Sequence, residues 1–205
     1  MLKDTKTTPK AIRLLIARTV DSIVREYFPT KYPALCHAYA VIGSNVISIA
    51  LGREYRPVAG LAVIDCGGGC FMNFTEAQVF DREGDGAYHC WIESCPQDGY
   101  EKEIVDISFI HNSAFAKSQN IVWRKKPSTY LWGNFADLVI DADPDNLPPS
   151  FPEGKMWVRE MPEGMEWLNR RVAEHMEHYA AFTALALKKL QNDSVRLSKS
   201  IRRGR

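Results

Sequence analysis

The chain has 205 residues, 45% of them hydrophobic, and its 26 basic and 25 acidic residues leave a net charge of +1. This length and apolar content predict a single domain, residues 1–205, whose core needs no disulfide or metal to hold it together. The near-zero charge does not favour partners that bind through bulk charge, so we expect neither a nucleic-acid nor a membrane partner.

The N-terminal stretch MLKDTKTTPKAIRLL lacks the basic start, apolar block and small-residue cleavage site of a signal peptide. No apolar run is long enough to span a bilayer, and five cysteines cannot all be paired with one another. We therefore expect a cytoplasmic protein with reduced thiols and without a cofactor.

Two helices are expected first. Apolar side chains recur at helical spacing over residues 10–27, which predicts an amphipathic helix. After Pro29 and Pro33, a second helix is expected over residues 34–51, with Gly52 as its stop signal. This segment contains no Asp, Glu, Lys or Arg, which is typical of a central helix surrounded by other elements.

The pattern then changes to that of strands separated by Gly-rich or Pro/Asp/Gly turns. The predicted strands span residues 57–66, 70–80, 87–95 and 102–110, with further short strands at 120–125 and 137–141. A loop is expected over 141–155.

A last amphipathic helix is expected over residues 163–190, and its apolar face either packs on the core or forms a homodimer interface. Helices followed by an antiparallel sheet and a covering helix predict an α+β fold. Its core is expected within residues 34–140.

Cys36 is expected near the start of the second helix if Pro33 lies in its first turn. The partial positive charge and free N–H groups of a helix N-terminus lower the pKa of a thiol and so favour a nucleophile. The alternative is a small buried residue, since free cysteines are among the most buried side chains. His37 is a poor base for Cys36, because adjacent helical residues point about 100° apart.

The other histidines are His89, His111, His175 and His178, of which His89 has the most informative setting. It lies in a strand, and the next strand carries Asp106 after the turn signal CPQDGY. A turn centred between Gln97 and Asp98 would place His89 opposite Asp106, where the carboxylate could orient the imidazole. The alternative is an ordinary polar pair on a wet sheet face.

Cys36 with AYA after it, then ALGREYRPVAG, HCWIE and IVDIS together resemble the transglutaminase-like core of the papain-like cysteine-enzyme superfamily, and within it a small bacterial family. The resemblance covers residues 34–108. It implies a papain-like fold, with Cys36 as nucleophile, His89 as general base and Asp106 as the residue that orients His89.

The same resemblance includes Trp91 and Glu93 in the HCWIE motif, and it leaves Tyr27 and Tyr32 as upstream candidates for the oxyanion partner. Trp91 is expected to shield the imidazole or to line the substrate site, with Glu93 and Tyr32 as further substrate-binding residues. The R-G-G-x-C sequence of arylamine N-acetyltransferases is absent, so acetyl-CoA use is not implied.

The implied activity is thiol-dependent acyl transfer on an unknown peptide, amide, isopeptide or thioester substrate. Two alternatives remain: an inactive papain-like fold that binds a peptide or partner, and a zinc-stabilised structural domain. The zinc alternative rests on Cys66, Cys70, Cys90 and Cys95, whose spacings are just admissible for a structural site. Cys90, however, alternates with His89 and should face the other side of its strand.

Overall fold

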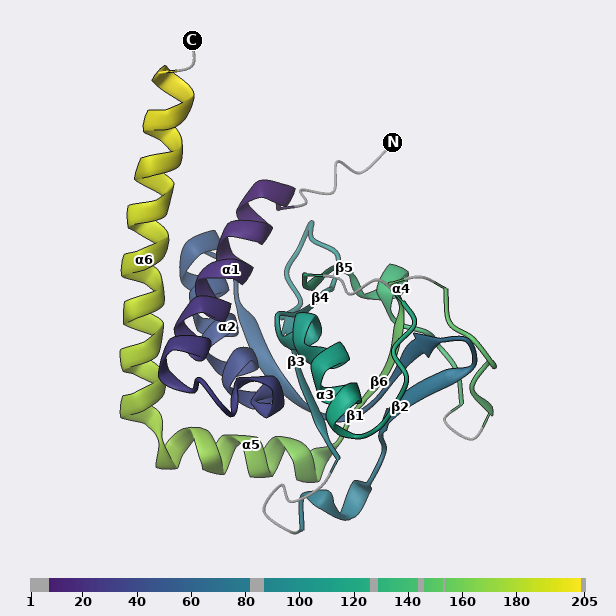
Figure 1. Cartoon of the computed structure of the whole chain (residues 1–205). Helices are drawn as coiled ribbons and strands as arrows, with labels where there is room; N and C mark the ends of the chain where they lie inside the picture. Colours follow the sequence, from purple (N-terminus) through teal and green to yellow (C-terminus); the bar gives the residue numbers. More distant parts are fainter. Residues whose placement is uncertain (1–7, 82–86, 126–128, 144–145, 153, 204–205) are drawn as a thin grey trace.

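The computed structural model describes residues 8–81, 87–125, 129–143, 146–152 and 154–203. It is an α+β fold in which helices flank a curled antiparallel sheet (Figure 1). The α-helices are α1 (Lys10–Tyr27), α2 (Cys36–Leu51), α3 (Asn112–Ser118), α4 (Phe135–Leu138), α5 (Pro162–Glu174) and α6 (Met176–Arg203). The strands are β1 (Tyr55–Gly67), β2 (Cys70–Phe74), β3 (His89–Ser94), β4 (Glu103–Asp106), β5 (Leu131–Asn134) and β6 (Met156–Glu160). Short 3₁₀ turns are η1 (Tyr32–Ala34), η2 (Ala77–Val79) and η3 (Ser108–His111).

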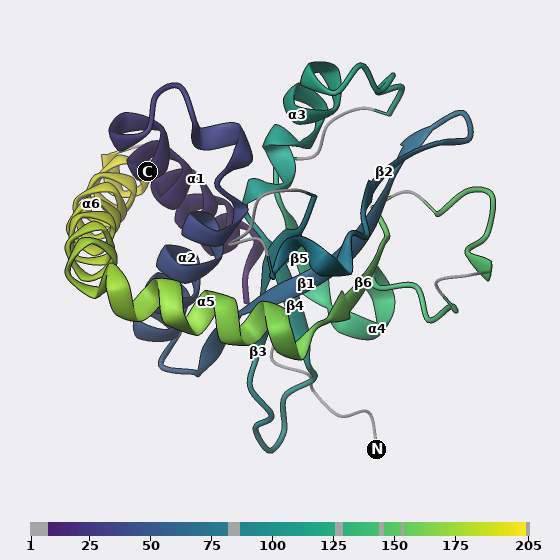
Figure 2. The same ribbon diagram turned by 90° about the horizontal axis from the view of Figure 1, so that it is seen from below.

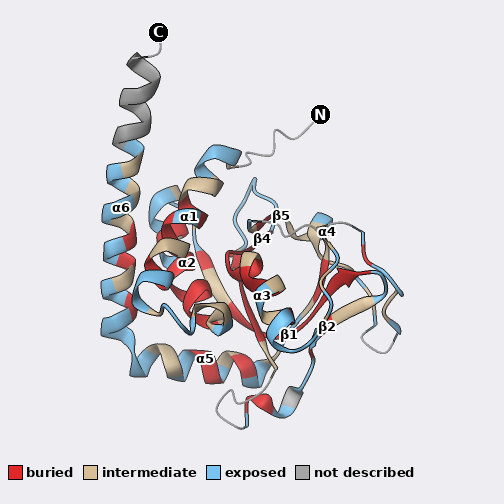
Figure 3. Ribbon diagram, in the orientation of Figure 1, coloured by how far each residue is buried: buried red, intermediate tan, exposed pale blue. Residues whose placement is uncertain are grey.

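Helix α2 is the central helix that the sequence predicts. It packs on β1 and β3 on one side and on α1 and α6 on the other (Figures 1 and 2). Most of its residues are buried, as the red ribbon in Figure 3 shows, because it contains no Asp, Glu, Lys or Arg and most of its side chains are apolar. It ends at Gly52, whose φ of 62° is left-handed and favours a residue without a side chain. The two predicted N-terminal helices are thus confirmed.

Strand β1 is the longest strand and has three neighbours. Residues 55–60 pair with β3, residues 62–67 with β2, and residues 60–64 with β6. Beyond β3 the sheet continues with β4 and then β5. Gly60 lies where β3 and β6 both meet β1, opposite His89 on one edge and Glu160 on the other.

The two faces of the sheet carry separate apolar clusters. The face toward α2 contributes Cys90 and Ile92 to a core shared with α1, α2, α5 and α6. The opposite face contributes Trp91 and Ile104 to a second cluster under α3 and the segment before α4. The alternation of β3 therefore sends odd-numbered and even-numbered side chains to different cores.

The predicted C-terminal helix is in fact two helices. The break is at His175, whose φ of −120° and ψ of 23° lie outside the helical region. On α5 the buried side chains include Trp167 and Leu168, whereas on α6 they include Tyr179 and Ala186. These two stripes face different partners, and the chain changes direction between them (Figure 1). Within the described part of the chain, no helix has the length and hydropathy needed to cross a bilayer.

Several predicted strands are shorter than expected or wrong. The strand predicted over 70–80 ends at Phe74 and is followed by η2, and the strand predicted over 102–110 ends at Asp106 and is followed by η3. Residues 120–125 form no strand; the backbone N–H groups of Arg124 and Lys125 donate to the carbonyl of Cys66, at 2.7 and 3.1 Å. Residues 137–141 contain the end of α4 and a single bridge from Val139 to Met156. Strands β5 and β6 were not predicted.

Candidate active site

Cys36 is the first residue of α2 and follows η1 directly, so Pro33 lies in the 3₁₀ turn before the helix. Leu35 occupies the N-cap position, and no side chain caps this end of the helix. The thiol therefore lies at the positive end of the helix dipole, beside backbone N–H groups that have no side-chain partner. Cys36 is partly exposed, whereas residues 37–44, which follow it on α2, are buried.

His89 is held by Asp106 on the neighbouring strand. The Nε2–H group of His89 donates to Oδ2 of Asp106 at 2.9 Å, and both residues are almost fully buried. The second carboxylate oxygen, Oδ1, accepts a hydrogen bond from the hydroxyl of Ser108 at 2.6 Å. Because Nε2 is engaged with Asp106, Nδ1 is the imidazole nitrogen left for another partner.

The predicted register between these strands is wrong by two residues. The turn is centred between Asp98 and Gly99, one residue later than expected, with the N–H of Tyr100 donating to the carbonyl of Gln97 at 3.1 Å. Gly99 has a φ of 81°, which explains why the turn is centred there. Ile92 is therefore paired with Val105, and Asp106 reaches His89 diagonally. A slip of two residues keeps both side chains on the same face of the sheet.

Aromatic rings enclose the His89 imidazole on the same face of the sheet. Phe74 stacks on it with ring centroids 5.2 Å apart, and Trp91 stacks at 6.4 Å. The indole N–H of Trp91 donates to Glu93 at 3.0 Å, and Glu93 also forms ion pairs with Arg56 and Lys102. Trp91 thus shields the imidazole, while Glu93 is a buried, fully paired carboxylate that fixes the indole.

The thiol interacts with two residues at the start of β3. A hydrogen bond with Cys90 lowers the pKa of the Cys36 thiol, burial opposes this effect, and a hydrogen bond and charge interaction with His89 bring the pKa to about 6. Burial also lowers the pKa of the His89 imidazole, but Asp106 and the Cys36 sulfur outweigh it and raise the pKa to about 10. Between these values the pair is a thiolate and an imidazolium, which is the reactive form of a cysteine nucleophile.

Cys90 is a neighbour of the thiol that the sequence analysis did not assign to the site. Burial and the hydrogen bond with Cys36 raise the pKa of Cys90, so it stays a neutral thiol and can donate S–H to the Cys36 thiolate. Its position on the α2 face of β3 agrees with the expected alternation. The missed signal was that this same face meets the N-terminus of α2.

His37 has its own partners and is separate from the thiol–imidazole pair. Its Nδ1 is 3.1 Å from the hydroxyl of Tyr88, and its ring packs edge-on against Trp167. Burial and the nearby charges of Arg171 and His175 lower the pKa of His37 to about 4, so it is neutral at physiological pH. Tyr88, which precedes His89, also lies within electrostatic range of Cys36 and was missed.

Tyr32 lies in a second polar cluster. Its ring packs edge-on against His111, with centroids 4.8 Å apart. The guanidinium carbon of Arg25 lies over the Tyr32 ring, 5.1 Å from its centroid. His111 is bound to Asp21 of α1 at 2.7 Å and to the Tyr39 hydroxyl at 3.0 Å. An acidic partner for His111 could not be predicted, because Asp21 is 90 residues away along the chain.

The remaining cysteines do not converge. All five are free, with Cys66 and Cys90 buried in different apolar clusters. In the described residues, no three His, Cys, Asp or Glu side chains gather as a metal-binding group. Cys90 contacts Cys36 instead of the three cysteines with which the zinc alternative groups it.

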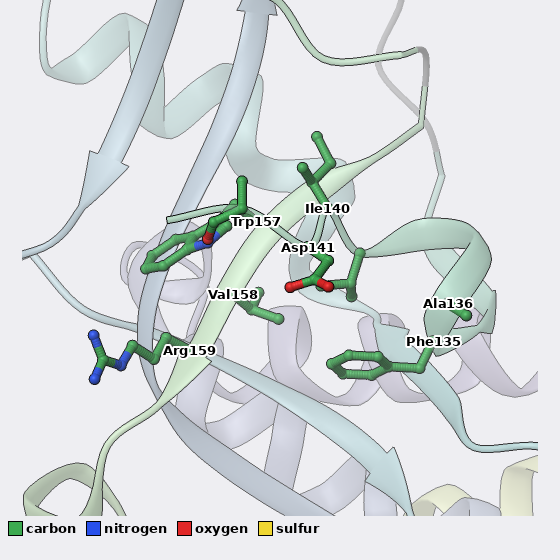
Figure 4. A pocket seen from close by; sticks show the side chains of 9 residues that line it. Phe135, Ala136, Ile140, Asp141, Trp157, Val158 and Arg159 are labelled. Carbon is green, nitrogen blue, oxygen red and sulfur yellow. The ribbon is translucent and has the colours of Figure 1, made fainter. Parts of the chain in front are cut away.

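The described surface includes two cavities large enough for a small molecule. One, of about 560 Å³, lies over β6 and α4 and is mostly apolar apart from Asp141 and Arg159 (Figure 4). The other, of about 450 Å³, is lined by Leu35 and His37, the two residues that flank Cys36 in the chain. Only the second cavity includes residues from the elements that carry the thiol.

Comparison with known proteins gives a likeness of fold. No family model matches the sequence, and no curated protein matches it. A solved structure described as "The crystal structure of genomics APC5867" matches with a TM-score of 0.61, covering 88% of this chain and 79% of that chain at 16% sequence identity. At this level of identity the match shows similarity of fold alone.

Proposed function

We propose that this protein is a papain-like or transglutaminase-like enzyme that catalyses thiol-dependent acyl transfer with Cys36, His89 and Asp106 as its triad. The observation that carries the proposal is the chain of interactions from Asp106 through His89 to a thiol at the head of a buried helix. It supplies a nucleophile, a proton carrier and a residue that orients the carrier.

The reaction begins with attack of the Cys36 thiolate on the carbonyl carbon of an amide, isopeptide or thioester. A carbon–sulfur bond forms, and the backbone N–H groups at the uncapped start of α2 are the nearest donors for the developing oxyanion. The His89 imidazolium then gives its proton to the leaving nitrogen or sulfur, whose bond to the carbonyl carbon breaks. An acyl-enzyme remains on Cys36.

The second half returns the enzyme to its starting state. Water or an amine attacks the acyl carbon, and His89 takes the proton from this incoming group. The carbon–sulfur bond breaks, which releases the acid or the new amide and restores the thiolate and imidazolium. Asp106 holds the ring in position through both halves and stabilises its positive charge.

Alkylation of Cys36 tests the proposal before any substrate is known. Iodoacetamide at pH 7 should modify Cys36 at least about tenfold faster than an ordinary thiol, because a thiol of pKa near 8.5 is only a few per cent ionised there. His89→Ala should slow this reaction at least about tenfold, while the control Gln191→Ala, at an exposed position of α6 that lines neither cavity, should not. Peptide mapping by mass spectrometry identifies the modified cysteine.

Circular dichroism should show that both variants remain folded, so that the comparison reports on the site. Slow alkylation of Cys36 in the unmodified protein would rule out the proposed nucleophile. Equal rates in the protein and its His89→Ala variant would remove His89 from its role.

A further inference from the structure

The cavity of about 450 Å³ beside the head of α2 has walls of two kinds. It lies between the segment from Phe28 to Ala38 and the junction of α5 with α6. Phe28, Leu35 and Phe182 give it an apolar side. Its volume is within the range of pockets that hold small organic molecules.

The other wall is rich in basic residues. Lys31, Arg171, His175 and His178 line it, and none of the lining residues is an Asp or a Glu. Among the residues that the structure describes, no carboxylate pairs with Arg171. A guanidinium without a carboxylate partner leaves its charge uncompensated, so this wall is suited to receive an anion from outside the chain.

Arg171 is held in place by two aromatic residues. Its guanidinium lies over the ring of Trp167 at 5.8 Å, and it is close enough to the Tyr179 hydroxyl to influence the pKa of that group. Both partners are buried. The donor is therefore held in position before any ligand arrives, which reduces the entropy that binding must overcome.

The cavity adjoins the thiol. Leu35, His37 and Ala38 all line it, and these residues flank Cys36 in the sequence. The hydroxyl of Tyr179, another lining residue, lies within electrostatic range of the Cys36 sulfur. The cavity therefore lies beside the head of α2, although Cys36 itself does not line it.

We propose that this cavity binds a small organic anion with an apolar body, its carboxylate or phosphate on Arg171 and its body against Phe28, Leu35 and Phe182. The inference rests on the proposed function in one respect. The anionic group is taken to belong to the substrate, whose carbonyl carbon Cys36 attacks. The binding itself is independent of that chemistry.

Calorimetric titration with three six-carbon probes tests the binding. Hexanoate and hexyl phosphate should each bind at least about tenfold more tightly than neutral hexanamide, and the tighter of the two identifies the headgroup. Arg171→Leu should weaken anion binding at least about tenfold, whereas Arg170→Leu, an exposed neighbour on the same helix that does not line the cavity, should leave it unchanged.

A second variant guards against a folding defect in Arg171→Leu. Lys31 is exposed, so Lys31→Met keeps the packing and should still weaken both anions about threefold. Equal binding of hexanamide and the anions, or unchanged binding in both cavity variants, would overturn the inference.

Protection from alkylation tests the placement beside the thiol. The bound anion should slow iodoacetamide modification of Cys36 with the same half-saturation that calorimetry gives. Saturating anion without protection would refute the placement. If Cys36 does not react even in the free protein, the proposed function fails, while the calorimetric comparison still decides whether the cavity is an anion site.

Discussion

The pKa of the Cys36 thiol depends on His89 and Cys90, two adjacent residues of β3 whose side chains face opposite sides of the sheet. His89 brings a positive charge that Asp106 sustains, and Cys90 brings a neutral S–H donor from the α2 face. Both favour the thiolate, but only the imidazolium can also pass a proton to a leaving group. In the proposed mechanism, stabilising the thiolate and transferring the proton are therefore separate roles, the first shared by His89 and Cys90 and the second left to His89 alone.

Replacing Cys90 should weaken the stabilisation of the Cys36 thiolate and preserve proton transfer by His89. In Cys90→Ala the Cys36 thiolate loses a donor, so the pKa of Cys36 should rise from about 6 by roughly one unit. Because the thiolate is the reactive form, the rise of the alkylation rate with pH should move upward by the same amount, about tenfold slower at low pH.

The matched control is Cys66→Ala, since Cys66 is equally buried but lies in the cluster on the other face of the sheet. Its pH profile should coincide with that of the unmodified protein. A Cys90→Ala profile that does not move would show that the second thiol has no part in the ionisation of Cys36.

The sequence could predict that Cys36, His89 and Asp106 lie together because each belongs to a short motif, and the structure does bring His89 and Asp106 into contact. It could not supply Cys90 or Ser108 as partners, since these roles follow from the register of β3 and from the seating of α2. The two-residue error in register had no effect on the facing of His89 and Asp106, because side chains on a strand alternate with a period of two. The position of Arg171 beside the cavity could not be predicted either, because α5 is far from residues 28–38 in the sequence and meets them only in the folded chain.

Among the elements, β1 connects the most strands, because β2, β3 and β6 all pair with it. Their approach is closest at Gly60, where a Cβ atom would lie 2.1 Å from the carbonyl oxygen of Arg159 on β6. No side-chain movement relieves this contact, since the obstacle is backbone. Glycine at this position is what lets β6 pair with β1 opposite His89.

Gly60→Ala should therefore push β6 away from β1. We expect a loss of about 3 kcal/mol in the free energy of unfolding, and faster amide hydrogen exchange over residues 156–160. Urea unfolding and exchange measured by mass spectrometry give the two readouts.

Gly52→Ala is the comparison, because Gly52 has a left-handed φ and open space around it. It should lose only about 1 kcal/mol and leave exchange in β6 unchanged. Similar exchange in the two variants would mean that the close approach at Gly60 is not what fixes β6.

The long helices could be predicted because their patterns extend over several turns, whereas the short late strands could not. Strands β5 and β6 have only four and five residues, too few for an alternating pattern to be distinguished from a loop. The change of direction at His175 was missed for another reason. Helical periodicity on either side of it continues, and only the identity of the two packing partners shows that there are two helices.

At the scale of the molecule, α6 forms an outer layer that covers α1 and α2 on the side away from the sheet (Figures 1 and 2). Its apolar stripe packs within the chain: Phe182 meets the rings of Tyr27 and Phe28 at 4.9 and 5.6 Å, and Ala186 is fully buried. The same helix supplies one wall of the 450 Å³ cavity. Docking of α6 thus contributes to the stability of the molecule and to the shape of the candidate ligand site.

Substitutions at two alanines of α6 distinguish the contribution of helix docking to stability from that of helix propensity. Ala186→Asp places a charge in the buried stripe and should cost about 3 kcal/mol or more in the free energy of unfolding, measured in urea. Ala184→Asp, on the exposed face of the same turn, carries the same propensity change and should cost about 1 kcal/mol or less. Equal costs would show that α6 is not anchored through this stripe.

The wide spacing of Cys36, His89 and Asp106 also has a consequence during synthesis. About 70 residues separate Cys36 from Asp106, so at typical translation speeds the cysteine is made roughly 4 to 14 s before its last partner. Until then it has neither the imidazolium nor the Cys90 donor, and it behaves as an ordinary thiol that is mostly protonated at neutral pH. If Cys36 is the proposed nucleophile, the nascent chain therefore does not expose it in activated form, and the thiol gains its reactivity only when the fold around it is complete.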